Sequence, residues 1–293
     1  MELKIKIDKK LFITFASKEM DPDQKIDYIL IDMSYFIFYR YFALVRWWKH
    51  AKPDNPLDLT KIGENKEFVE KFEKTFQDKI KEVPKKLKLK RVKYMIGKDC
   101  GREKIWRNDI CGFYKANRVN DDEFMVGIFF EKAYKILEKE KMAILYHPKL
   151  EADDCIALTT KYLLSKNENN FIYIIANDMD YLQLIQEKVM IINLKYKNLA
   201  ENKNWSGNGE KDLFCKIVMG DKSDNIPSIF EKCGPKTALK CYEDKEYFKR
   251  KLENEEISSH FLKNKRLIDF NEIPEELKIE FLEFLNSTLS SPH

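Results

Sequence analysis

The chain has 293 residues, of which 35% are charged and 44% are hydrophobic. This length fits a large α/β domain with a smaller appended lobe, and the apolar share is sufficient for a sizeable core. Basic and acidic residues nearly balance, with 53 Lys and Arg against 49 Asp and Glu. The balance excludes a generally basic protein, so any nucleic-acid binding must depend on how the charges are distributed.

The six cysteines are spaced singly, with no CxxC pair and no histidine at zinc-finger spacing. This pattern argues against a disulfide framework and against a structural zinc ion. The longest apolar stretches have only strand length, and Met1 begins a polar, Lys-rich segment without the hydrophobic core of a signal peptide. We therefore expect a soluble intracellular protein, not inserted in a membrane, in a reducing compartment.

Apolar runs of strand length alternate along the chain with longer segments of helical spacing. The sequence predicts strands at 28–32, 92–96, 171–176 and 189–193, and helices at 34–48, 66–81, 124–141 and 152–165. This alternation indicates an α/β fold with a mainly parallel central sheet and helices on both of its faces.

A stretch rich in Asn, Gly, Lys and Glu, residues 198–212, predicts an exposed loop. The segment from Leu213 onward predicts a second, helical part, and the tail at 286–293 is expected to fray. We therefore expect a division into residues 1–212 and residues 213–293.

Nine carboxylates lie in five short motifs, each beside a hydrophobic segment. They are Asp32, Asp99, Glu151, Asp153, Asp154, Asp178, Asp180, Asp221 and Asp224. Ligands of parallel sheets bind beyond the carboxyl ends of the strands, which is where Asp32, Asp178 and Asp180 are predicted. Ionised carboxylates in one cluster repel each other, so such a cluster must stay partly protonated or bind hard divalent metal ions. The set predicts a metal-dependent enzyme acting on phosphodiesters.

Each acidic motif alone also has a simpler explanation. The EADD run at 151–154 places acids in a first helical turn, where they stabilise the helix dipole. The DxD at 178–180 is common in turns, and the two acids at 221 and 224 could lie in a loop. Independent turns and caps would rarely produce these motifs in this order, which favours one joint site.

Three stretches carry a specific resemblance: LEADD at 150–154, ANDMDYLQL at 176–184 and GDKSDNIP at 220–227. Together they resemble the signature of the 5′-nuclease family, which comprises flap endonucleases and the 5′-exonucleases of replication. The phage replicative ribonuclease H branch is the most similar. Two features of this chain resemble that branch. One is Asp99 followed by Trp106, Arg107, Asp109 and the FYKANR run at 113–118, and the other is RLIDFNEIP at 266–274.

The resemblance implies the PIN-like fold of 5′-nucleases, with a helical arch over about 107–145 and a C-terminal, DNA-binding helix-three-turn-helix lobe. It also implies two Mg²⁺ ions, for which Mn²⁺ would substitute. Asp32, Asp99, Glu151 and Asp153 would hold one ion, Asp178, Asp180, Asp221 and Asp224 would hold the second, and Asp154 would support both. Two such ions roughly 4 Å apart lower the pKa of an attacking water and stabilise the leaving oxygen. The expected products carry a 5′-phosphate and a 3′-hydroxyl.

Tyr114, Lys115 and Arg118 have helical spacing and would share one face of an arch helix. We interpret them as catalytic residues. The two cations would neutralise charge on the scissile phosphate, and the tyrosine would stack on an unpaired base. A solvated Lys/Arg face with a partly buried tyrosine is the alternative interpretation. Arg102 and Arg107 are further predicted phosphate contacts.

Residues 225–241 resemble the family's helix-three-turn-helix, whose hairpin binds the duplex backbone beside a monovalent cation. The predicted nucleic-acid contacts here are Ser223, Asn225, Gly234, Lys236 and Thr237. Ser228 and Lys232 stand where the cellular pattern has glycines, and glycine lets the backbone approach a phosphate closely. Ser228 and Lys232 therefore argue against the family's hairpin geometry and its monovalent-ion site. The alternative is a pair of helices that pack together without contacting DNA.

The resemblance implies a structure-specific 5′-nuclease, with 5′-3′ exonuclease, flap endonuclease and ribonuclease H activities, that removes RNA primers or 5′ flaps. The expected substrates are DNA with a 5′ end or flap and RNA–DNA hybrids. We expect a monomer in the cytoplasm or at a phage replication site, with single-strand-binding protein and a sliding clamp as candidate partners. The alternatives are a PIN-like ribonuclease and a catalytically silent, structure-specific DNA-binding protein.

Overall fold

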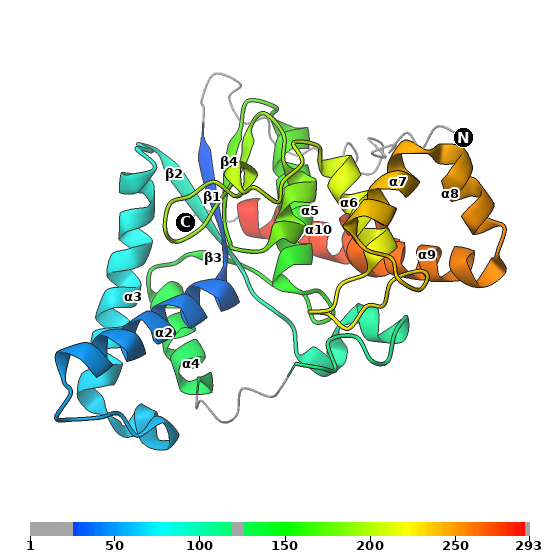
Figure 1. Ribbon diagram of the computed structural model, residues 1–293. Helices are drawn as coiled ribbons and strands as arrows, with labels where there is room; N and C mark the ends of the chain where they lie inside the picture. Colours follow the sequence, from blue (N-terminus) through cyan, green and yellow to red (C-terminus); the bar gives the residue numbers. More distant parts are fainter. Residues whose placement is uncertain (1–25, 119–125, 291–293) are drawn as a thin grey trace.

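The computed structural model describes residues 26–118 and 126–290, and its centre is a five-stranded sheet (Figure 1). The strands are β1 (Asp27–Asp32), β2 (Val92–Gly97), β3 (Ala143–Leu145), β4 (Phe171–Ile175) and β5 (Val189–Ile192). Their order is β3-β2-β1-β4-β5, and every neighbouring pair is parallel, which confirms the predicted α/β fold. The sequence did not predict β3, because three residues are too few to show a period.

Helices cover both faces of this sheet and form a lobe beside it. They are α2 (Met33–Ala51), α3 (Lys66–Lys86), α4 (Gly127–Lys139), α5 (Ala152–Lys166), α6 (Gly209–Met219), α7 (Pro235–Glu243), α8 (Lys245–Leu252), α9 (Glu255–Ile268) and α10 (Glu275–Ser290). Ile29 and Ile31 of β1 pack with α2, α3 and α4. Tyr28 and Leu30 point to the opposite face and pack with α5 and α10. Burial on both faces explains the continuous apolar run of β1.

Short 3-10 helices lie in the connections and at the edges of the sheet. They are η1 (Leu59–Glu64), η2 (Arg102–Lys104), η3 (Trp106–Asp109), η5 (Met179–Leu184), η6 (Leu199–Glu201) and η7 (Phe270–Glu272). Among the residues described, no helix has both the length and the apolar character needed to span a membrane. All six cysteines are free thiols.

The chain after β5 forms a helical lobe and then returns to the sheet (Figure 1). α6 to α9 enclose a small core that includes Val218, Ala238 and Phe248. α10 packs on α5 and buries Phe281 and Leu285 in the main core. Because α6 begins at Gly209, helical structure starts four residues before the expected position, and the domain boundary at 212 stays a prediction.

Two predicted segments differ from the structure. α10 extends to Ser290, so the tail does not fray at 286–290, and residues 291–293 lie outside the described part. α4 is not part of a free-standing arch, because its Phe129, Ala133 and Leu137 are fully buried beside α2 and α3. The arch expected over about 107–145 is therefore contradicted at α4, and residues 119–125 of that segment are outside the described residues.

Candidate metal centre

The predicted acids lie at one edge of the sheet because the carboxyl ends of parallel strands meet there. Asp32 ends β1 and caps α2, where it accepts a hydrogen bond from the N–H of Tyr35 at 3.0 Å. Asp99 follows β2 by two residues, and Asp178 lies three residues after β4. α5 begins at the same edge, with Glu151 at its N-cap. Residues far apart in sequence thus reach one place.

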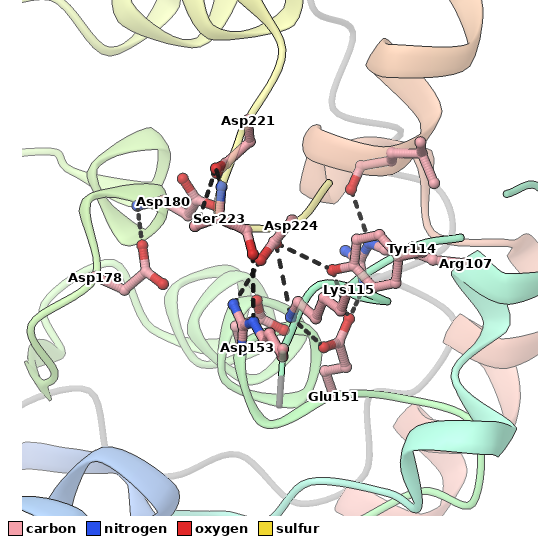
Figure 2. A network of polar contacts seen from close by, with 12 residues as sticks. Arg107, Tyr114, Lys115, Glu151, Asp153, Asp178, Asp180, Asp221, Ser223 and Asp224 are labelled. Atoms are coloured by element: carbon pink, nitrogen blue, oxygen red, sulfur yellow. Dashed lines mark hydrogen bonds and ion pairs between the residues drawn. The ribbon is translucent and has the colours of Figure 1, made fainter. Parts of the chain in front are cut away.

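Two sets of carboxylates each have ligand oxygens within 4.8 Å of one another. The first acid group is Glu151, Asp153 and Asp154, and the second acid group is Asp180, Asp221 and Asp224. Lys115 joins them, because its Nζ lies 2.5 Å from Glu151 Oε1 and 3.7 Å from Asp224 Oδ2 (Figure 2). Both groups therefore belong to one centre.

Asp32 and Asp99 border the first acid group. Asp99 accepts hydrogen bonds from the N–H of Ala152 at 2.8 Å and from the hydroxyl of Ser34 at 2.5 Å, which tie it to α5 and α2. Asp32 also accepts a hydrogen bond from the hydroxyl of Tyr181 at 3.1 Å. Burial raises the pKa of Asp32 to about 7, and the neighbouring charge of Asp99 adds to this rise.

Lys216 of α6 pairs with two members of the second acid group. Its Nζ contacts Asp180 Oδ1 and lies 2.6 Å from Asp221 Oδ2. Burial raises the pKa of Asp180 to about 6 in spite of the lysine. Burial alone would raise the pKa of Asp221 too, but Lys216 and two hydrogen bonds from Ser223 hold it at about 2. Asp178 lies beside this group and accepts the N–H of Asp180.

Arg107 is a buried cation that holds the first acid group, and its predicted contact with phosphate is wrong. Its side chain is 2% exposed. The guanidinium donates to Glu151 at 2.8 Å and to both carboxylate oxygens of Asp154, while Nε donates to the carbonyl of Leu267. Trp106 Nε1 donates to Asp154 as well. Because both its oxygens are engaged, Asp154 suits a supporting role better than direct metal binding.

Tyr114, Lys115 and Arg118 do not share the face of an arch helix. This stretch forms turns, and Lys115 has a φ of +54°, outside the helical region. Tyr114 is buried, and its hydroxyl donates to Glu151 at 3.0 Å, so the predicted stacking of its ring on a base is wrong. Arg118 is half-exposed and lies 2.5 Å from Asp224. The two cations still border the acids, although turns rather than a helix place them.

Three predicted nucleic-acid contacts lie around the same turns. Arg102 is exposed, and its Nη1 donates to the carbonyl of Arg118 at 3.1 Å. Asn225 has a φ of +59° and donates its side-chain amide to the carbonyl of Phe113 at 2.9 Å. Ser223 is exposed and bonds Asp221 as described. Their contact with nucleic acid stays a prediction.

The hairpin between α6 and α7 keeps a left-handed backbone at Lys232, with a φ of +54°, although glycine is absent there. The hydroxyl of Ser228 donates to the carbonyl of Phe230 at 2.9 Å. Gly234 caps α7, with open space where a Cβ would stand, and Lys236 and Thr237 lie in the first turn of that helix. Lys232 thus adopts the left-handed conformation that glycine accepts most easily, and both the family's hairpin geometry and the phosphate contacts stay predictions.

The two acid groups fit divalent ions by the chemistry of their donors. Every donor is a carboxylate oxygen, which hard cations such as Mg²⁺ prefer to nitrogen or sulfur. Burial raises the pKa of Asp153 well above its usual range, and the charges of Glu151 and Asp154 add to the rise. Such a rise means that the protein's own cations compensate this carboxylate incompletely, and a bound metal ion would complete the compensation.

The metal-free protein is expected to lose stability as the pH rises from about 5.5 to 8. Asp32, Asp153 and Asp180 have raised pKa values, so the folded state binds more protons than the unfolded state in this window. Asp221, whose pKa is lowered, is ionised in both states there and contributes no change. We expect the Tm to fall by on the order of 5 °C.

Thermal melts of chelator-treated protein at a series of pH values measure this dependence. Asp32→Asn should weaken the dependence of the Tm on pH, because it removes one of the titrating groups. A Tm that rises toward pH 8 without metal would contradict the linkage.

Three residues that contact acids of the centre were not predicted as site residues. Lys216 and Tyr181 contact predicted acids from neighbouring elements, and Trp106 was read only as part of a family motif. Lys216 lies five residues before Asp221, and residues at that spacing do not share a helix face, so the sequence carried no usable signal of this contact.

Residues 27–210 match a family model described as the 5′-3′ exonuclease N-terminal resolvase-like domain. The ribonuclease H of Enterobacteria phage T4 is 30% identical over 220 residues, which cover 64% of this chain and 68% of that protein. The 5′-3′ exonuclease of Bacillus subtilis is 34% identical over 159 residues, with 52% of each protein covered. The chain thus spans about half the length of that bacterial relative.

Two solved structures share the fold. The bacteriophage T5 D15 protein co-crystallised with metal ions has a TM-score of 0.61 at 16% identity, covering 89% of this chain and 99% of that one. The T5 D15 flap endonuclease complex with DNA and metal ions also has a TM-score of 0.61 at 16% identity, covering 90% and 100%. The family model spans well over half of the chain, and the phage T4 relative is matched over two thirds of its length. The chain therefore belongs to the 5′-3′ exonuclease family of nucleases.

Proposed function

We propose that this chain is a divalent-metal-dependent, structure-specific nuclease that removes RNA primers or 5′ flaps during DNA replication and repair. The observation that carries the proposal is the pair of acid groups at the strand ends, joined through Lys115. The names of the relatives, a ribonuclease H and several 5′-3′ exonucleases, support this substrate class. The T5 complex with DNA and metal ions supports DNA with a 5′ end or flap.

Two Mg²⁺ ions would lower the pKa of an attacking water and stabilise the leaving oxygen of an in-line displacement, which gives 5′-phosphate and 3′-hydroxyl products. We assign Asp32, Asp99, Glu151 and Asp153 to the first ion and Asp178, Asp180, Asp221 and Asp224 to the second. Arg107, Asp154 and the hydroxyl of Tyr114 hold Glu151 in its orientation. No histidine or serine nucleophile is required.

Lys115 and Arg118 would bind the scissile phosphate once metal ions compensate the acids. Burial alone would lower the pKa of Lys115, but Glu151 and Asp153 hold it above the usual value, so the ammonium is charged at neutral pH. Arg118 is half-exposed and contacts the other oxygen of the Asp224 carboxylate. Both cations can therefore turn from carboxylate to phosphate oxygens and stabilise charge in the transition state.

Replacing Lys115 with alanine is expected to lower kcat on a flap substrate by about 10² to 10³, with a smaller effect on KM. The reason is that the ammonium acts mainly on the charge that develops during displacement. Steady-state kinetics with saturating Mg²⁺ measures the two parameters separately. Lys104→Ala, which removes an exposed lysine from η2, is the matched control. A defect confined to KM would contradict this role.

Product sizing on a 5′-labelled flap substrate, with Mg²⁺ or with EDTA, tests the proposed function directly. We expect cleavage near the flap junction with Mg²⁺ and none with EDTA. A catalytically silent DNA-binding protein would bind the flap and leave it intact in both conditions. A PIN-like ribonuclease would cut single-stranded RNA in preference to the flap, but the helical lobe of α6 to α9 favours a duplex substrate.

A further inference from the structure

Lys216 stands where a cation would bind in the second acid group. Its side chain is 26% exposed, and its partners Asp180 and Asp221 are 16% and 15% exposed, so this ion pair is largely shielded from solvent. These two carboxylates, with Asp224, form the group whose oxygens could hold a metal ion. An ammonium and a divalent ion on the same two carboxylates would repel each other strongly in such surroundings. The lysine and the ion therefore compete.

A cavity of about 500 Å³ lies beside the second acid group and leaves room for a displaced Lys216 side chain. Asp180 and Lys216 lie in its wall near the metal centre, and Trp205 and Asp212 also line it. Asp212 lies four residues before Lys216 on α6, the acid-first spacing that favours an ion pair along a helix. The Asp212 carboxylate accepts the N–H of Ser206 at 2.9 Å, which fixes its position.

We infer that Lys216 is the resident cation of the second acid group and moves toward Asp212 when a divalent ion takes its place. This inference rests on the proposed two-ion function. Without metal, the lysine compensates Asp180 and Asp221 and keeps the strand edge and α6 together. Binding of the second ion must break these ion pairs, so Lys216 makes that ion bind more weakly than the carboxylates alone would allow. Lys216 thus sets the metal-ion concentration at which the second of the two sites is occupied.

Mn²⁺ titrations of the metal-free full chain, followed by electron paramagnetic resonance, test this role without any cleavage assay. Asp180→Asn identifies the second ion by removing its binding. Lys216→Met is expected to bind the second ion about tenfold or more tightly, whereas Lys216→Arg, which keeps the charge, should stay within about threefold of the wild type. Asp212→Asn should weaken the second ion by about threefold, because the displaced lysine loses its new partner.

Lys249→Met is the matched control, since it removes an exposed lysine from α8, away from the cavity that Asp212 and Lys216 line. Equal tightening in Lys249→Met and Lys216→Met would overturn the inference, because a general change of charge would then explain both. Unchanged or weaker binding of the second ion in Lys216→Met would overturn it as well.

If Lys216→Met does not fold, the ¹⁵N resonance of the Lys216 ammonium in the wild type decides the matter. We expect this signal to move during the second step of a Mg²⁺ titration, and a signal that stays in place at saturation would refute displacement. The two proposals fail separately. If Lys216→Met binds the second ion more tightly but the wild type shows no nuclease activity, the proposed function alone is refuted. If the wild type cleaves its substrate but Lys216→Met binds the second ion no more tightly, the inference about Lys216 alone is refuted.

Discussion

Asp153→Asn is expected to lower the turnover of a flap substrate by on the order of 10³ or more, with the affinity for DNA nearly unchanged. The substitution keeps the shape of the side chain and removes a charge that Glu151 and Asp154 already disfavour. Metal binding in the first acid group loses one ligand, and the chemistry assigned to that ion is lost with it. Duplex binding should persist, because the predicted contacts Gly234, Lys236 and Thr237 lie at α7, outside the first acid group.

Single-turnover cleavage and fluorescence anisotropy on the same labelled flap measure the two effects. Asp109→Asn, which removes an exposed acid from η3 outside both acid groups, is the matched control and should cleave like the wild type. The metal-free Asp153→Asn protein should also melt at a higher temperature than the wild type, because a repelling charge is gone. Turnover that survives in Asp153→Asn would remove Asp153 from the metal ligands.

The sequence was most informative where the chain itself repeats one local arrangement, an apolar run followed by an acid. β1 and β4 are buried on both faces, so their runs are continuous, and the acid that follows each run marks the strand end. In a parallel sheet these ends meet by geometry alone, so Asp32 and Asp178 could be placed together without knowledge of the packing. A strand of three residues such as β3 leaves no comparable pattern.

What the sequence could not predict depends on contacts between distant segments. Arg107 was predicted to contact phosphate, yet it is buried because Asp154 and the carbonyl of Leu267, 160 positions away, meet its guanidinium. Tyr114 and Phe113 are adjacent aromatics, and only the tertiary fold decides that the first is buried and the second exposed. The helical spacing of Tyr114, Lys115 and Arg118 likewise predicted the wrong local structure. Lys115 has a left-handed backbone, which is stabilised by the hydrogen bond from its N–H to the carbonyl of Asp224.

Arg107→Met should destabilise the protein by about 3 to 5 kcal/mol, the largest stability change we expect from a single substitution in this centre. Methionine fills a similar volume but leaves Glu151 and Asp154 buried without their shared cation. The carbonyl of Leu267 also loses its donor. Urea unfolding in metal-free buffer measures the loss, and Arg250→Met, which removes an exposed arginine from α8, should change the free energy of unfolding by less than about 0.5 kcal/mol.

The double variant Arg107→Met, Asp154→Asn separates the unpaired charge from the lost packing. If the unpaired charge of Asp154 causes most of the loss, the neutral asparagine should restore a large part of the stability that Arg107→Met removes. If the loss comes from packing, the two substitutions should add. Mg²⁺ should also stabilise Arg107→Met more than the wild type, because an ion in the first acid group compensates the charge on Glu151 that the arginine no longer neutralises. Equal stabilisation of both proteins by Mg²⁺ would show that Arg107 acts apart from the metal centre.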